Sequence, residues 1–174
     1  DAGNGLYAVP NTNPKQTSPS GVMRDGFDAY LRPTGEAIDY GLVAYVENQA
    51  RAYEALLKAA YFLFPDHSKA YSWATLAKEL RRRMLERMWL DDQGFFASAF
   101  DKNGPVTTKS SAAFEVLSGP FLEGLDETPE YVTLLMRHLY SGNFMTPVGV
   151  RMVSLEHQDL EGGDYYAYQG SGAV

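Results

Sequence analysis

Hydrophobic residues recur at helical spacing in two long stretches of the chain. The first covers residues 38–64, with apolar side chains every three or four positions, and Pro65 ends it. The second follows an N-cap at Asp66 or Ser68 and carries an apolar stripe that ends at Met88. Because the connection between them is short, we expect an antiparallel helical hairpin.

Charged residues mark the opposite faces of these two predicted helices. In the first, the spacing predicts the salt bridges Glu47–Arg51 and Glu54–Lys58, each with the acid four residues before the base. In the second, residues 81–83 are consecutive arginines, which cannot share one helical face. We prefer a solvated surface over an anion-binding site for these arginines.

Shorter elements follow the hairpin. Residues 90–104 indicate a short extended piece between two turns, and residues 110–119 a short helix closed by Gly119 and Pro120. A further helix is expected from Thr128, as its cap, to residue 142. We therefore expect an all-α chain with long loops, either a single domain or a fragment of a larger catalytic domain. Its parts are a loop-rich, acid-bearing segment (1–36), helical hairpins (37–140) and an aromatic, glycine-rich loop region (141–174).

Composition narrows the functional classes. The 174 residues are 45% hydrophobic and carry a formal net charge of −7, which disfavours a nucleic-acid partner. No apolar run approaches the roughly 20 residues that span a bilayer, so no membrane partner is expected. The absence of cysteine is compatible with the cytoplasm, where we expect the protein. The three histidines lack metal-ligand spacing and no nucleotide-binding motif occurs, so we expect neither a metal nor another cofactor.

The candidate chemistry lies in the stretch "SGVMRDGFDAY", which contains Asp25 and Asp28. On these residues alone, an aspartate between arginine and glycine is more typical of a turn. If Arg24 points at Asp25 it lowers the pKa of that carboxyl, whereas the like charge of Asp28 raises it.

Other polar residues could contact a sugar. Gln49 shares the apolar helical face with Tyr53, while Glu47 lies about 200° away around the helix. A buried amide needs a hydrogen-bonding partner, and a sugar hydroxyl and a core backbone group are equally open alternatives. Arg151 and Gln169, in the last loops, could bind sugar hydroxyls or order those loops.

Several motifs occur in an order that resembles a known family. "MRDGFD" is similar to an acid loop of the form "WKDS-x-D", and "ENQARAYEA" to the inner-helix pattern "E-x-Q-x-x-x-Y-x-A". "GFFASAFDKNG", "SSAAFEVLSG", "GVRMVS" and "YYAYQGSGAV" follow, so the likeness covers nearly all of the chain. Together they resemble the catalytic domain of glycogen-debranching, amylo-α-1,6-glucosidase-like glycosidases.

The resemblance implies an (α/α)6 toroid of helical hairpins, of which this chain is an incomplete part, and an oligosaccharide or glucan substrate. It implies inverting hydrolysis with Asp25 as general acid. The base would lie outside this chain, so the remainder of a parent chain is an expected partner and the 174 residues alone are expected to be inactive. The substrate-binding residues would be Arg24, Asp28, Gln49, Tyr53, Arg151 and Gln169.

Two other interpretations stay open. Met23 stands where the family has a tryptophan, which favours a non-catalytic carbohydrate-binding or interaction module on the same helical scaffold. Alternatively the protein hydrolyses a different substrate, such as trehalose or a mannosyl compound.

Overall fold

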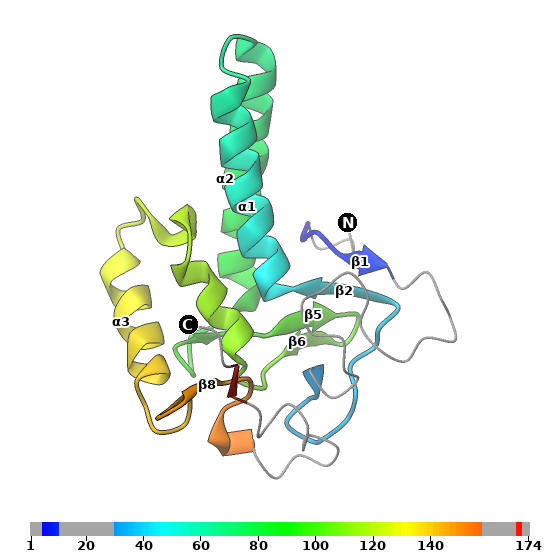
Figure 1. The fold of residues 1–174 in the computed structure, drawn as a ribbon. Coiled ribbons are helices and arrows are strands. Elements are labelled where there is room, and N and C mark those ends of the chain that lie inside the picture. Colours follow the sequence, from blue (N-terminus) through cyan, green and yellow to red (C-terminus); the bar gives the residue numbers. More distant parts are fainter. Residues whose placement is uncertain (1–4, 11–29, 158–169, 172–174) are drawn as a thin grey trace.

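The computed structural model describes residues 5–10, 30–157 and 170–171, and Figure 1 shows how their elements are arranged. A long helical hairpin rises from a body in which short helices surround small antiparallel sheets. The helices are α1 (Val46–Phe62), α2 (His67–Met88) and α3 (Thr128–Leu139), with 3-10 helices η2 (Ser111–Leu117), η3 (Pro120–Leu122) and η4 (Leu155–His157). The strands are β1 (Val9–Pro10), β2 (Leu42–Tyr45), β3 (Trp89–Leu90), β4 (Phe95–Phe96), β5 (Ala99–Asp101), β6 (Gly104–Val106), β7 (Met145–Thr146), β8 (Gly149–Arg151) and β9 (Gly170–Ser171).

The expectation of an all-α fold is wrong, because antiparallel sheets occur throughout the described chain. One sheet has the strand order β1-β2-β5-β6, another pairs β3 with β4, and a third has the order β7-β8-β9. The third sheet lies in the region expected to be only loops, and the first places strands among the expected hairpins. Pairing between distant segments, which periodicity within one segment does not reveal, accounts for these differences.

The first long helix begins later than its periodicity predicts. Residues 42–45 are extended because their backbone pairs with β1 on one side and with β5 on the other, with Ala44 opposite Phe100 and Tyr45 opposite Ala99. Helix α1 therefore starts at Val46, directly where the strand ends. This junction fixes the direction in which the first turn of α1 presents its side chains.

The helical hairpin itself is confirmed. The Asp66 side chain caps α2 by accepting a hydrogen bond from the Lys69 amide at 3.2 Å. Glu54 and Lys58 form the predicted salt bridge at 2.6 Å. The apolar stripe of α2 is not buried along its whole length, because Trp73 and Leu76 on it are 37% and 46% exposed.

The core lies where the base of the hairpin meets the body. Fully buried aromatic rings from β4, η3 and the segment before β7 pack against α1 and α2, including Phe95, Phe96, Phe121 and Phe144. A second, smaller cluster gathers on the other side of β2, around Tyr30, Val43 and Tyr45. The two clusters meet different faces of the β2–α1 junction.

The later short elements differ from expectation in detail. Residues 111–117 form a 3-10 helix, in which the Ser110 hydroxyl accepts from the Ala112 amide at 3.3 Å. Helix α3 begins at Thr128, so Thr128 is its first residue and not, as expected, its cap, which is Glu127. The helix ends at Leu139, three residues before the expected end. Over residues 5–10, 30–157 and 170–171, no helix is long and apolar enough to cross a membrane.

Candidate functional site at the start of helix α1

The predicted catalytic residue, Asp25, lies outside the described residues, as do Arg24, Asp28 and Gln169. The structure does describe the chain on both sides of the segment that carries Asp25, namely residues 5–10 before it and residues from Tyr30 onward after it. Both flanks reach the first turn of α1. The candidate site is therefore built from this turn and from the residues that contact it.

Gln49 holds the flank that precedes the segment. Its Oε1 accepts a hydrogen bond from the Tyr7 amide at 2.9 Å, and its Nε2 donates to the Tyr7 carbonyl oxygen at 2.7 Å and to the Tyr45 carbonyl oxygen at 3.2 Å. The side chain is 0% exposed. Of the two alternatives for this amide, the structure shows backbone partners, and a contact between Gln49 and a sugar stays a prediction.

Glu47 contacts the other flank. The Tyr30 hydroxyl donates a hydrogen bond to Glu47 Oε1, and the carboxylate is only 2% exposed. The predicted Glu47–Arg51 salt bridge is wrong, because Arg51 Nη2 instead lies 2.8 Å from Glu115 Oε2. Glu47 turns toward the smaller core cluster, whereas Arg51, one turn later, reaches the 3-10 helix η2.

Two tyrosines line the Glu47 carboxylate. The rings of Tyr30 and Tyr45 lie 4.7 Å apart between centroids and are inclined at 54°. Burial raises the pKa of Tyr45 well above its usual value, and the charges of Tyr40 and Glu47 add to that shift. The Tyr45 phenol is therefore neutral at ordinary pH and contributes a polar but uncharged wall beside the acid.

Tyr53 packs in the main core. Its side chain is 4% exposed, its ring meets Phe121 edge to face with centroids 5.4 Å apart, and the Arg81 guanidinium lies 5.3 Å from the ring centroid. Arg81 also donates to the carbonyl oxygens of Phe121 and Glu123. These contacts give Tyr53 a packing role, and its role in binding substrate stays a prediction.

The next two arginines of α2 lie on the surface, as predicted. Arg82 pairs with Glu79 at 2.7 Å and with Glu86 at 2.5 Å, and Arg83 pairs with Glu79 at 2.5 Å. Hydrogen bonds from these two arginines lower the pKa of Glu79 to about 2. The guanidinium charges are thus balanced within their own helix.

Arg151 lies in β8, where its amide donates to the Phe144 carbonyl oxygen at 2.9 Å. Its buried Nε has no hydrogen-bonding partner among the described residues. Strand pairing sets Arg151 opposite Gly170, which directly follows Gln169 in the sequence. Gln169 itself lies outside the described residues, and sugar binding by Arg151 and Gln169 stays a prediction.

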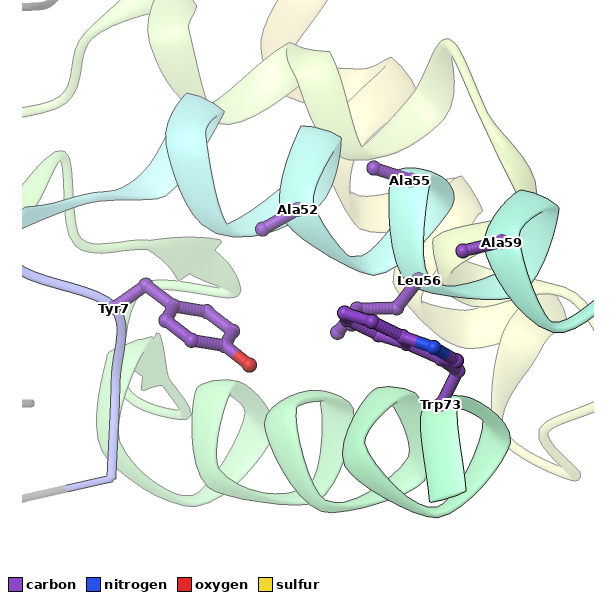
Figure 2. A pocket seen from close by; sticks show the side chains of 6 residues that line it. All are labelled: Tyr7, Ala52, Ala55, Leu56, Ala59 and Trp73. Carbon is purple, nitrogen blue, oxygen red and sulfur yellow. The ribbon is translucent and has the colours of Figure 1, made fainter. Parts of the chain in front are cut away.

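A groove between α1 and α2 does not have the chemistry of a sugar site (Figure 2). Its volume is about 380 Å³, and Tyr7, Ala52, Ala55, Leu56, Ala59 and Trp73 line it. The Tyr7 hydroxyl and the Trp73 indole N–H are the only polar side-chain atoms among these residues. Binding a sugar here would leave most of its hydroxyl groups without a partner, which is unfavourable.

A salt bridge holds the chain that leaves Tyr30. Arg32 Nη2 contacts Asp101 Oδ1 at 2.5 Å, and the second oxygen of Asp101 accepts from the Asp39 amide at 2.8 Å. The Thr108 hydroxyl donates to the Leu31 carbonyl oxygen at 2.6 Å. Within the part of the chain that the structure describes, no group of three His, Cys, Asp or Glu side chains could hold a metal ion.

Sequence reasoning missed Tyr7, Tyr30 and Asp101, and it assigned Glu47 to the wrong partner. The motif that includes both Glu47 and Gln49 pointed to the first turn of α1. The four-residue spacing, however, predicted Arg51 as the partner of Glu47. No local pattern connects Tyr7 or Tyr30 to this helix, since the contacts join residues 42 and 17 positions apart in the sequence.

Comparisons with known proteins give one family model and several similar folds. The model of the mannosylglycerate hydrolase MGH1-like glycoside hydrolase domain matches residues 2–167. Neutral trehalase Nth1 from Saccharomyces cerevisiae is similar over 66% of this chain and 22% of its own, with 19% identity and a TM-score of 0.53. A sialidase is similar over 87% of this chain and 12% of its own, with 12% identity and a TM-score of 0.62.

These structural likenesses show the fold alone, because their sequence identities are low, and this chain spans under a quarter of the length of either solved structure. No curated protein sequence matches the chain. The family model, in contrast, covers nearly the whole sequence, including the segment with Asp25. The chain belongs to the family of mannosylglycerate hydrolase MGH1-like glycoside hydrolase domains.

Proposed function

We propose that the protein carrying this chain hydrolyses an α-glycosidic bond with inversion, and that Asp25 is the general acid. The observation that carries the proposal is the glycoside hydrolase domain match over residues 2–167, which includes Asp25. The motifs around Asp25 support the assignment, because they resemble the acid loop of related glycosidases. The partner carboxylate comes from outside these residues.

The proposed reaction needs two carboxyl groups on opposite sides of the scissile bond. Asp25, protonated, gives its proton to the departing glycosidic oxygen, while a carboxylate about 6.5–9.5 Å away takes a proton from the attacking water. Water attacks the face of the sugar opposite to the leaving group, so the product has the inverted anomeric configuration. Arg24, Asp28, Arg151 and Gln169 supply hydrogen bonds to the sugar in this proposal.

Three substrate types follow from the sequence and the comparisons. The sequence resemblance favours an α-1,6-linked glucan of the glycogen-debranching type. The family description adds mannosylglycerate, and the trehalase likeness adds trehalose. All three present a glycosidic oxygen that must be protonated as it leaves, so the proposed role of Asp25 is the same for each.

The test uses the full-length protein with these three substrates. Wild-type protein should release sugar from at least one of them, and NMR of the fresh product should show the inverted anomer. Asp25→Asn should lower kcat about 10²- to 10⁴-fold, because the amide cannot donate the proton with comparable ease. Asp126→Asn, at an exposed acid on the connection before α3, serves as the matched control and should leave kcat unchanged.

Two results would overturn this proposal. Equal activity of wild type and Asp25→Asn would remove Asp25 from the acid role. Saturable binding of a glycan without hydrolysis of any of the three substrates would favour the non-catalytic carbohydrate-binding module.

A further inference from the structure

Both flanks of the segment that carries Asp25 are attached to one helical turn. Gln49 binds the backbone of Tyr7, before the segment, and Glu47 binds the hydroxyl of Tyr30, after it. Each contact joins residues far apart in the sequence, and the acceptor or donor on α1 is almost completely buried in both cases. Both contacts lie in described residues, so variants of these residues can test them.

The Gln49 contact holds the first flank at two points. The side-chain amide donates to and accepts from the same residue, Tyr7, in the way that a neighbouring strand would. A third hydrogen bond, to the Tyr45 carbonyl oxygen, fixes the orientation of the amide itself. Tyr7 therefore cannot shift along the chain direction without breaking two partly buried hydrogen bonds.

Packing in the main core also holds the first flank in place. Leu6 is 0% exposed within the main core. Gly5 has a φ of +76°, and a Cβ atom built there would lie only 1.5 Å from the Arg83 guanidinium. This φ favours glycine, because another residue would strain the backbone here and the Arg83 side chain would have to move to make room for it.

The Glu47 contact holds the second flank. The Tyr30 hydroxyl donates to the Glu47 carboxyl group where both side chains are buried, so water does not compete for this hydrogen bond. Tyr30 is 1% exposed, and the residues after it are held by Thr108 and by the Arg32–Asp101 salt bridge. Asp25 lies between the two flanks and is nearer in sequence to Tyr30.

The spacing of the two residues on the helix explains how one turn serves both flanks. Positions two apart are rotated by about 200° around an α-helix, so Glu47 and Gln49 face nearly opposite directions. Gln49 faces the main core, where Leu6 is buried, and Glu47 faces the smaller cluster with Tyr30 and Tyr45. The strand β2, paired on both sides, sets the position of this turn.

We propose that Glu47 and Gln49 are positioning residues, which hold the two flanks of the Asp25 segment and so set the place from which Asp25 acts. This inference rests on the proposed function for its catalytic part. Its structural part, that each residue holds one flank, stands apart from that function. Neither residue needs to touch the substrate in this role.

The experiment compares four single variants and one double variant of the full-length protein. Tyr30→Phe removes only the hydroxyl, Glu47→Gln replaces the carboxyl group by an amide, and Gln49→Leu removes the amide while keeping similar volume. Glu115→Gln is the matched control, because it breaks an ion pair of the same helix at the exposed side chain of Arg51. Hydrogen exchange of peptides covering residues 5–10 and 30–38 is measured together with kcat and KM.

The expected result is selective for each flank. Tyr30→Phe and Glu47→Gln should speed exchange in residues 30–38 and leave residues 5–10 unchanged, whereas Gln49→Leu should do the reverse. All three should lower kcat about ten- to a hundredfold with little change in KM, since a small displacement of a catalytic group has effects of this size. The double variant Tyr30→Phe with Glu47→Gln should lose no more activity than the worse single variant, because both changes act on one shared contact. Glu115→Gln should match wild type.

The outcomes separate the two proposals. Unchanged exchange in both flanks of Tyr30→Phe, Glu47→Gln and Gln49→Leu would overturn the positioning role, whatever the activity. Faster flank exchange with wild-type kcat would overturn its catalytic part. Selective flank exchange in a protein whose wild type hydrolyses none of the three substrates would support the attachment and reject the proposed function.

Discussion

At the scale of single residues, His157 shows how burial changes a titration. It is half-buried in the 3-10 helix η4, next to a surface salt bridge between Lys109 Nζ and Glu156 Oε2 at 2.7 Å. Burial lowers the pKa of His157, and the charge of Lys109 lowers it further, while Glu156 opposes both effects. Its Nε2 has no hydrogen-bonding partner among the described residues.

A titration of this histidine should therefore have a midpoint below 6.5. The unfolded chain binds a proton near pH 6.5 and the folded chain only at lower pH, so the neutral ring contributes stability above that pH. That contribution is lost as the pH falls from 6.5 through the folded pKa. NMR of the imidazole protons, with the resonance identified by its absence in His157→Gln, measures the midpoint. A value at or above 6.5 would contradict the burial argument.

At the scale of elements, one buried aspartate joins the β5–β6 hairpin to the chain after Tyr30. The Asp101 side chain is 0% exposed and accepts from Arg32 at 2.5 Å, from the Asp39 amide at 2.8 Å and from the Asn103 amide at 2.8 Å. By contrast, the Glu54–Lys58 pair of α1 has side chains that are 30% and 64% exposed. The two ion pairs differ mainly in exposure: water can solvate the Glu54 and Lys58 charges if their pair is broken, but it reaches Asp101 poorly.

Asp101→Asn should destabilise the protein much more than Glu54→Gln. The first change leaves partly buried donors, including the Arg32 guanidinium, without a charged acceptor, and should lower the free energy of unfolding by about 3 kcal/mol. The second breaks a solvated pair and should cost less than about 1 kcal/mol. Equilibrium urea denaturation of the two variants and wild type gives both values. Similar losses for the two variants would show that Asp101 is not the anchor described.

The helical hairpin was predictable from the sequence, whereas the strands were not. Helix α2 has its expected cap, Asp66, and its expected end, Met88, because caps and periodicity are local signals. Residues 42–45 have the same apolar spacing as the helix that follows, yet they are extended. What decides their conformation is pairing with β1 and β5, which come from distant parts of the chain.

For the candidate site, the sequence indicated the right turn of helix but not the contacts. Gln49 was expected to be buried with a polar partner, and the structure shows that this partner is the backbone of Tyr7. Glu47 was expected on the surface with Arg51, and it is buried against Tyr30. Helical spacing gives the direction of a side chain, but what it meets depends on the tertiary fold.

At the scale of the whole molecule, the outer half of the α1–α2 hairpin carries a large apolar surface. Figure 1 shows this half extending away from the body. Its exposed aromatic residues are Tyr61 (78%), Phe62 (74%), Phe64 (64%) and Tyr71 (76%). Contiguous apolar patches of this kind promote association in water.

Recombinant residues 1–174 should therefore self-associate as concentration rises. Replacing Tyr61, Phe62 and Phe64 together by serine should shift the equilibrium toward monomer, and sedimentation velocity measures the change. Val148→Ser is the control, because Val148 is 82% exposed but lies apart from the hairpin, in the β7–β8 turn. A wild-type chain that stays monomeric at all concentrations would contradict this prediction.

The central claim is that Asp25 donates a proton to the leaving group, and a comparison of leaving groups tests it most directly. The full-length protein and its Asp25→Asn variant are assayed on the best natural substrate and on the glycosyl fluoride of the same sugar. Fluoride departs without general-acid help, so Asp25→Asn should lose about 10²- to 10⁴-fold in kcat on the natural substrate and far less on the fluoride. Equal losses on both substrates, or no loss on either, would contradict the assignment of Asp25 as the general acid.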